Sequence, residues 1–342
     1  MSEFRIDKIT NRVGDAGTQI TGITTFSGTS GMIMPGGPPE YRGGRGRGLF
    51  GGGYNPTLSN VINYVEIGTL GNATDFGDLS AARKFVSSSG DSTRGLFMAG
   101  ETPSQVGLID YVDIQSKGGS NVFGNLSKDR AFGVACNSPT RGVYFSGYLP
   151  NPYAGTREID YVIIKTEGNG TAFGDLVPPR YGAGAGSSAT RGICGGGALS
   201  PGPVANMKNI EYIEIETGGT ALDFGELSSG RHYVSAISNP TKTVWGGGVT
   251  PTTVNTIDYI TTATKGNSSD WGDLTVAARG LGSGSATTPT RGLFLSGKHD
   301  SGYYNVINYI TFSTTGNAVD FGDSTALASY CGAISDTNGG LG

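Results

Sequence analysis

The chain has 342 residues, a formal net charge of −4, 60 glycines and 15 prolines. The slightly acidic balance gives no electrostatic case for a nucleic-acid partner. No apolar run reaches the roughly 18 residues of a membrane span, and no basic-then-apolar leader opens the chain, so we expect neither membrane insertion nor a signal peptide. Glycine and proline stay below the share typical of disordered chains, which favours a folded protein.

Residues 1–46 come before any repeated sequence. Short alternating pieces, such as residues 19–26, are interrupted by Gly, Ser and Pro and cannot form a core alone. We expect an extended arm that gains order by adding strands to a partner. A disordered leader, or a strand wrapped on the chain's own folded domain, is the alternative. Arg42, Arg45 and Arg47 among glycines are too few to predict RNA binding in an acidic chain.

Residues 47–342 repeat one unit six times. Each copy opens with Arg-Gly or the variant Lys242-Thr243, and the copies begin at residues 47, 94, 141, 191, 242 and 291. The period is therefore 47 to 51 residues. A period of this length is typical of solenoids, propellers and arrays.

The first copy contains four phrases, at residues 47–53, 61–69, 71–79 and 81–92. They are rich in Val, Ile, Thr, Tyr and Phe and are separated by Gly, Asn, Asp and Ser, as strands and turns are. No phrase has a helical apolar period, so helices should be nearly absent. Gly-Asn pairs between the second and third phrases look like hairpin turns. They lie at residues 71–72, 168–169, 266–267 and 316–317.

Four short strands per repeat predict an all-β, six-bladed β-propeller of kelch-like blades with an N-terminal arm. We expect the strand around residues 331–336 to pair with the strand around residues 49–53, so that one blade joins both ends and the ring closes. Glycines at residues 51–53, 195–197 and 246–248 are expected in the strand nearest the axis, where backbones converge.

Recurrent aromatic residues are expected to fill the layers between blades. The second phrase carries Tyr64, Tyr111, Tyr161, Tyr212, Tyr259 and Tyr309. The third carries Phe76, Phe123, Phe173, Phe224, Trp271 and Phe321.

An acidic residue ends most third phrases, and an arginine follows four to six residues later. We interpret these residues as structural acid–Arg pairs that brace the turn to the fourth strand, with a ring of charges for an anionic sugar or ion as the alternative. The predicted pairs are Asp78–Arg83, Asp175–Arg180, Glu226–Arg231 and Asp273–Arg279.

The copies differ most in the segment that joins the first two strands. Variable loops on a rigid scaffold are where recognition usually occurs, and tyrosine suits carbohydrate or protein contacts. The candidate ligand-contact residues are Tyr54, Tyr148, Tyr153, Tyr303 and Tyr304, with plain connecting loops as the alternative.

We expect no enzyme, no cofactor and no metal. A sialidase-like site needs an arginine cluster, a Tyr nucleophile and a carboxylic acid, but the Asp-box signature of that family is missing. His232 and His299 lie in different copies without metal-ligand spacing and are expected at the surface or in turns. Cys136, Cys194 and Cys331 form no CxxC pair and are expected as buried, reduced thiols of a protein made in a reducing cytoplasm.

The segment at residues 20–53 (ITGITTFSGTSGMIMPGGPPEYRGGRGRGLFGGG), followed by units such as INYVEIGTLGNATDFGDL, resembles kelch-like propeller proteins of marine tailed bacteriophages, particularly those that infect cyanobacteria. The resemblance covers essentially the whole chain. It implies a virion protein of the tail, baseplate, neck or fibre, made in the host cytoplasm. The arm would then bind other virion proteins, and the sequence leaves self-association open.

Three functions follow from this resemblance and from the loops. The first is a structural protein of the particle whose propeller attaches to a host-surface glycan or protein. The second is a purely architectural protein of the capsid surface or the neck and tail junction, without a host ligand. The third, which the missing motifs disfavour, is a glycan-cleaving enzyme.

Overall fold

The computed structural model describes residues 46–342 except 152, 202–203, 326–327 and 338–342. The chain divides into two units after Pro39, and the described residues all belong to the second unit, Glu40–Gly342. Residues 1–45 of the predicted arm lie outside the described residues. The second unit is all β, as predicted, and the residues described in it include no helix that could cross a membrane.

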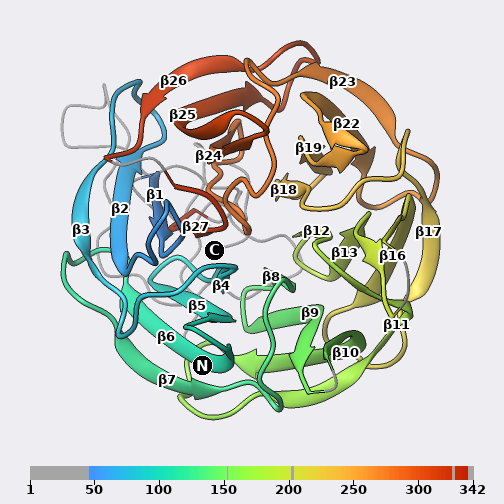
Figure 1. Cartoon of the computed structure of the whole chain (residues 1–342), viewed down its shortest axis with the longest axis horizontal. Helices are drawn as coiled ribbons and strands as arrows, with labels where there is room; N and C mark the ends of the chain where they lie inside the picture. The colour runs from blue at the N-terminus through green and yellow to red at the C-terminus, as the bar shows by residue number, and fades with distance from the viewer. Residues whose placement is uncertain (1–45, 152, 202–203, 326–327, 338–342) are drawn as a thin grey trace, which may run out of the picture. The chain divides into compact units, whose positions relative to one another are not determined.

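Six antiparallel sheets stand around a common axis as the blades of a propeller (Figure 1). Blade 1 contains β27 (Gly332–Ser335), β1 (Arg47–Gly51), β2 (Val61–Glu66) and β3 (Thr74–Asp78). Blade 2 contains β4 (Ser87–Gly90), β5 (Arg94–Glu101), β6 (Gln105–Asp113) and β7 (Asn121–Asn125). Blade 3 contains β8 (Val134–Asn137), β9 (Arg141–Pro150), β10 (Tyr153–Ile163) and β11 (Thr171–Tyr181).

The remaining blades follow the same order from the axis outward. Blade 4 contains β12 (Gly184–Ser187), β13 (Arg191–Gly195), β16 (Asn209–Glu214) and β17 (Leu222–Glu226). Blade 5 contains β18 (Ser235–Ser238), β19 (Lys242–Gly246), β22 (Thr256–Thr261) and β23 (Ser269–Asp273). Blade 6 contains β24 (Arg291–His299), β25 (Gly302–Thr311) and β26 (Val319–Asp323).

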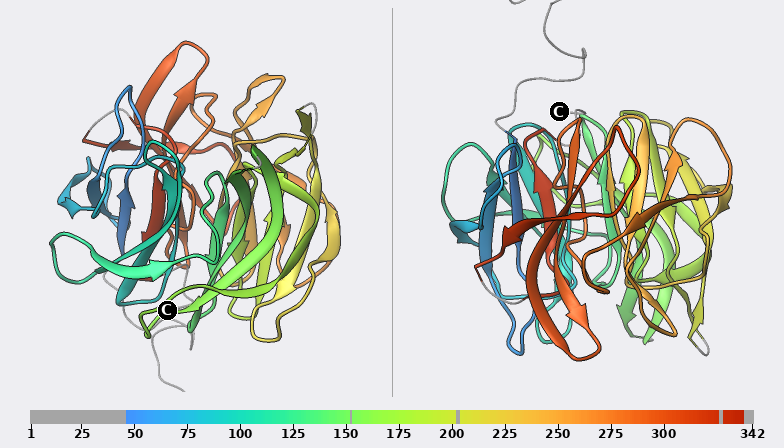
Figure 2. Two further views of the ribbon diagram at one scale, coloured as in Figure 1. Left: turned by 60° about the horizontal axis from the view of Figure 1, so that its bottom comes forward. Right: turned by 90° about the horizontal axis from the view of Figure 1, so that it is seen from above.

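Two short pairs of strands add to these six blades. The hairpin of β14 (Ala198–Leu199) and β15 (Ala205–Asn206) extends the sheet of blade 3, and β20 (Val249–Thr250) pairs with β21 (Thr252–Thr253). In blade 6 the inner place is taken by residues 281–287, which exchange isolated backbone hydrogen bonds with β24. The strands run between the two ends of the ring, so the connecting loops gather at both ends (Figure 2).

The two ends of the ring pair in blade 1, which confirms the predicted closure. Strand β27 lies antiparallel to β1, with Gly48 opposite Ser335 and Gly51 opposite Gly332. The carboxylate of Asp336 also accepts hydrogen bonds from the backbone N–H groups of Gly46 and Arg47. The first blade is therefore assembled from both ends of the repeat region, and β1 is paired on both sides, with β27 and with β2.

The strand nearest the axis is the fourth phrase of each copy, so the prediction that assigned the glycine-rich first phrase to this place was wrong. The described inner strands read SSSG, VACN, GAGS, SAIS and GAIS and are buried throughout. Their small hydroxyls join different blades: the Ser187 N–H donates to Ser238 Oγ of the neighbouring blade at 3.0 Å, and Ser87 Oγ of blade 2 lies 2.9 Å from Ser283 Oγ of blade 6. Small side chains thus allow these strands to pack together along the axis.

The predicted Gly-Asn hairpin turns have a different role. The tight turn comes earlier, where the Thr69 N–H donates to the Glu66 carbonyl, and Gly71 then hydrogen-bonds to the outer strand of blade 6. The same bond from one copy to the preceding copy occurs all around the ring. Its donor–acceptor pairs are Gly71–Phe321, Gly118–Phe76, Gly168–Phe123, Gly219–Phe173, Gly266–Phe224 and Gly316–Trp271.

We call this circle of hydrogen bonds around the outside of the ring the outer belt. It explains the glycine of the Phe-Gly-Asp phrase. A Cβ on Gly77 or Gly124 would overlap the carbonyl oxygen of Gly118 or Gly168 in the belt. The adjacent aromatic residue points into the layer between blades, where Phe76 is 3% exposed and Trp271 is 2% exposed. The third phrase therefore anchors the core and the belt together, and the predicted burial of its aromatic ring is confirmed.

The Arg-Gly opening and the tyrosine of the second phrase form one unit. The guanidinium carbon of Arg94 lies 4.3 Å from the centre of the Tyr111 ring, and its Nη1 donates to the Ile164 carbonyl of the next blade at 3.1 Å. Tyr111 in turn meets Phe123 edge-on. All six copies repeat this stack, with Lys242 as the cation in blade 5. These tyrosines are only half-buried, because the cation rather than a blade covers them.

The predicted acid–Arg pairs have the wrong partners. Arg83 pairs with Asp110 at 3.0 Å rather than with Asp78. Its guanidinium also donates to the carbonyls of Leu108 and Phe97, each at 3.1 Å. The corresponding pairs are Arg130–Asp160, Arg180–Glu211 and Arg231–Asp258, so Asp175 and Glu226 are not their partners. Arg279 instead pairs with Asp300 rather than Asp273, on the surface.

These four arginines are fully buried. Each comes from the connection between two blades and reaches the third strand from the axis in the following blade. Burial lowers the pKa of Arg83 and of Arg231, and the carboxylates of Asp110 and Asp258 oppose that shift. A buried charge is tolerable here because carboxylate and carbonyl oxygens surround it.

Candidate functional site

The candidate tyrosines lie at one end of the ring. Tyr54 meets Tyr303 edge-on, with ring centres 6.1 Å apart, and Tyr148 meets Tyr181 at 5.1 Å. Tyr304 contacts the ring of His299 at the tip of the hairpin between β24 and β25. These four are half-buried, and Tyr153 begins β10 opposite Pro150. The structure thus brings Tyr54 and Tyr303 together but does not unite all five.

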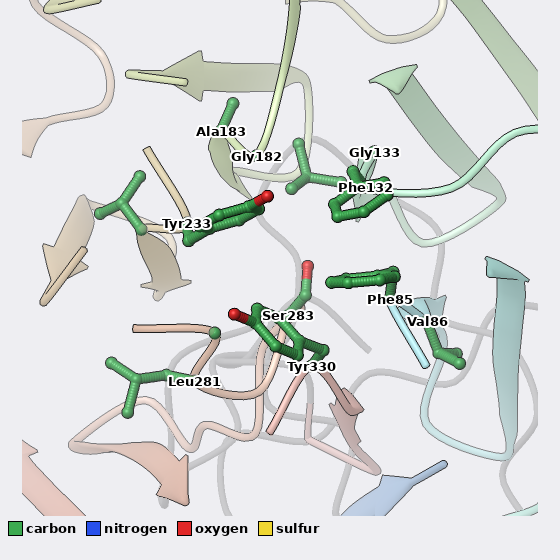
Figure 3. A pocket seen from close by; sticks show the side chains of 13 residues that line it. Phe85, Val86, Phe132, Gly133, Gly182, Ala183, Tyr233, Leu281, Ser283 and Tyr330 are labelled. Carbon is green, nitrogen blue, oxygen red and sulfur yellow. The ribbon is translucent and has the colours of Figure 1, made fainter. Parts of the chain in front are cut away.

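A second set of aromatic residues surrounds the axis at this end and was not among the candidates predicted from the sequence. In each of the six copies, one position just before the inner strand is equivalent to that position in the other copies. These positions hold Phe85, Phe132, Gly182, Tyr233, Gly280 and Tyr330. We call the four rings among them the axial aromatic cluster. They point toward a common centre (Figure 3).

All six of these positions have left-handed backbone conformations. The φ angles are 57° at Phe85, 60° at Phe132, 53° at Tyr233 and 62° at Tyr330. Such a conformation costs roughly 1–3 kcal/mol for a residue other than glycine. Gly182 and Gly280 avoid this cost, so the fold does not require aromatic residues at the other four positions. Retained strain of this kind is a reason to infer a function.

The two glycines make room for the rings of the following copies. A Cβ on Gly182 would lie 3.0 Å from the ring of Tyr233, and one on Gly280 would overlap the ring of Tyr330. The circle of rings closes across these glycines. The ring-centre distances are 3.6 Å for Phe85–Phe132, 5.9 Å for Phe132–Tyr233, 5.6 Å for Tyr233–Tyr330 and 4.5 Å for Tyr330–Phe85. The four rings therefore pack as one plug over the small inner strands.

The space enclosed within the cluster is only about 40 Å³. Ligand pockets usually measure about 300–1,000 Å³. A ligand consequently does not enter the axis here, and contact with the rings occurs from outside. The half-buried faces of the rings form an apolar platform at the centre of this end.

Polar and charged groups surround the platform. Lys84 lies 4.9 Å from the centre of the Tyr54 ring and 5.2 Å from that of Phe85, and it pairs with Glu101. The Nδ1 atom of His232 lies 2.6 Å from Oδ1 of Asn206. Burial and the nearby Arg279 charge lower the pKa of His232, so it is neutral at pH 7. The rim thus offers hydrogen-bonding groups around an apolar centre.

The three cysteines are buried and free, as predicted. Burial raises the pKa of all three thiols, to about 12 for Cys194 and Cys331. Such thiols stay protonated at neutral pH and are poor nucleophiles. In the part of the chain that the structure describes, no three His, Cys, Asp or Glu side chains are placed to hold a metal ion.

Comparison with models of known protein families and with curated proteins finds no match to this chain.

Proposed function

We propose that this protein is a non-enzymatic attachment propeller of a phage particle, and that it contacts a host-surface glycan or protein through the axial aromatic cluster. The observation that carries the binding role is the left-handed conformation of four aromatic residues where two copies use glycine. The location in a virion is an inference from the sequence resemblance alone.

Three features support contact by this end of the ring. The rings give a rigid apolar platform, since each packs against two others. Tyr54 and Tyr148 extend this platform outward, because Tyr148 contacts Phe132 and Lys84 connects Tyr54 with Phe85. Aromatic anchors surrounded by polar groups are the usual composition of a binding surface.

The test uses the substitution Tyr233→Gly, which copies the residue present at positions 182 and 280. Loss of the backbone strain should raise the stability of the fold, and loss of ring packing should lower it. We therefore expect the unfolding midpoint to stay within a few degrees of wild type. We expect labelling of host cells by the purified full chain, and its competition with phage adsorption, to fall at least about tenfold.

The matched control is Thr217→Ala on the exposed loop after β16, at the other end of the blade. It should label cells as wild type does. If wild-type protein neither labels cells nor competes with adsorption, the attachment role is wrong and the architectural role takes its place. Release of sugar from host envelopes would instead indicate an enzyme.

A further inference from the structure

The buried arginines divide the six blade interfaces into two kinds. At four interfaces an arginine reaches a carboxylate of the next blade. Between blades 5 and 6 the equivalent residues are Ala278 and Asn308, and between blades 6 and 1 they are Ala328 and Asn63. The arginine and its carboxylate are both replaced by smaller or neutral groups at these two interfaces.

The space left by the missing arginine stays open only where the ring closes. Between blades 6 and 1 there is a cavity of about 300 Å³, lined by Asn63 and Ala328. Between blades 5 and 6 the cavity beside Ala278 and Asn308 measures about 10 Å³, with Tyr304 as part of its wall. The first volume is roughly twice that of an engineered cavity that binds benzene, and the second barely admits a water molecule.

We call the cavity between blades 6 and 1 the seam cavity. Its walls correspond to the groups that hold Arg83. That guanidinium is held by Phe97, Leu108 and Asp110. Their equivalents in blade 1 are Phe50, Val61 and Asn63, and all three line the cavity. The cavity is thus the guanidinium site of the other interfaces with its carboxylate replaced by a carboxamide.

The described lining carries no charged side chain. Its polar aliphatic side chains are Asn55, Thr57, Ser59, Asn60, Asn63, Ser324 and Thr325. Amides and hydroxyls each donate and accept hydrogen bonds, which matches a ligand rich in hydroxyl groups. A cation would find no carboxylate here and an anion no basic group, so the ligand is neutral.

The remaining wall is apolar. Phe50, Leu58 and the ring of Tyr54 line one part of the cavity. A sugar ring presents C–H groups on its faces and hydroxyls around its edge, so it suits an apolar wall with amides and hydroxyls beside it. We propose that the seam cavity binds one neutral sugar residue. The cavity shares the Tyr54 ring with the edge of the platform, but none of the four rings of the axial aromatic cluster lines it.

The experiment titrates the full chain with neutral hexoses and their methyl glycosides, followed by saturation-transfer NMR and calorimetry. We expect a dissociation constant in the millimolar range or tighter, which corresponds to about −4 kcal/mol. Binding of a methyl glycoside indicates the end residue of a glycan, whereas binding of free hexoses alone indicates a soluble sugar.

The decisive variant is Ala328→Arg with Asn63→Asp, which installs the ion pair of the other interfaces. It should weaken sugar binding at least about tenfold. Asn55→Ala with Asn60→Ala removes two lining amides and should weaken binding similarly, which keeps the test valid if the first variant does not fold. Tyr233→Gly is the matched control and should bind sugar as wild type does.

Two results would overturn the proposal. One is that no probe sugar binds the wild-type chain. The other is that sugar binds equally well to a folded variant whose cavity is filled by arginine.

Discussion

The interface between blades 1 and 2 and the interface between blades 6 and 1 carry different residues at equivalent buried positions. The first buries Arg83 against Asp110, and the second has Ala328 beside Asn63. In both, a hydroxyl just after the outer strand donates to this third-strand residue: Ser80 Oγ donates to Asp110, and Thr325 Oγ1 donates to Asn63. The two interfaces differ in charge.

This contrast indicates that the charges are kept or lost in pairs. Each of the four buried arginines faces an acid, and both interfaces without the arginine have asparagine in place of the acid. An unpaired buried charge is costly, so the chain has either both partners or neither. The neutral interfaces flank blade 6, one of them being the interface that closes the ring.

The largest effect is expected from breaking the closing interface itself. Deletion of residues 332–342 removes β27, the strand that pairs with β1. The open sheet edge should cause aggregation and the loss of essentially the whole folding free energy, about 5–15 kcal/mol. Size-exclusion chromatography and thermal unfolding measure this. A truncated chain that stays monomeric and as heat-stable as wild type would disprove the closure.

A smaller effect is expected when one partner of a charged interface is removed. Asp110→Asn leaves the buried Arg83 without its carboxylate, and the free energy of unfolding should fall by about 3–5 kcal/mol. Urea unfolding measures it. The control is Asp78→Asn, at the acid first predicted to pair with Arg83, which should change stability by less than about 0.5 kcal/mol.

Converting a charged interface into a neutral one should cost less. Arg83→Ala with Asp110→Asn recreates the Ala–Asn combination of blade 6 and leaves mainly a cavity, so we expect a loss of about 2 kcal/mol. A double-mutant cycle with the two single variants then gives the coupling between the charges. Strictly additive single effects would show that the two residues do not act as a pair.

The smallest effect concerns His232, which follows Arg231 in the connection between blades 4 and 5. Its pKa is below the ordinary value in the folded chain, because it is buried and close to Arg279. The unfolded chain therefore takes up the proton first as the pH falls. The contribution of this residue to stability is full above its unfolded pKa of about 6.5 and is lost as the pH falls through the folded pKa. His232→Gln should flatten the fall in unfolding midpoint over this window; an unchanged pH profile would exclude the effect.

Much of the fold could be predicted from the repeat. A period of 47 to 51 residues with strand-like phrases predicts the blades, their number and the closure, because no single copy can bury its own apolar faces. The recurrent third-phrase aromatic residues were correctly placed in the core, since an apolar ring at one position of every copy has few other uses.

The interactions between copies could not be predicted in the same way. The nearest acid in the sequence suggested Asp78 for Arg83, but the partner lies 27 residues later, in another blade. Covariation among the six copies was the available signal, since Asn63 and Asn308 occur only where the arginine is absent. The axial aromatic cluster was missed because Phe85 and Tyr330 look like ordinary strand residues until their φ angles are known.

The number of blades, the phrases that become strands and the place where the chain closes on itself can all be read from the amino-acid order, because strand patterns and turns are local and every copy repeats them. The carboxylate that neutralises each arginine, the rings that meet at the axis and the place where a cavity remains became known only from the folded ring. Those outcomes depend on distances between residues far apart in the chain, and the ring brings them together only when all six blades have packed.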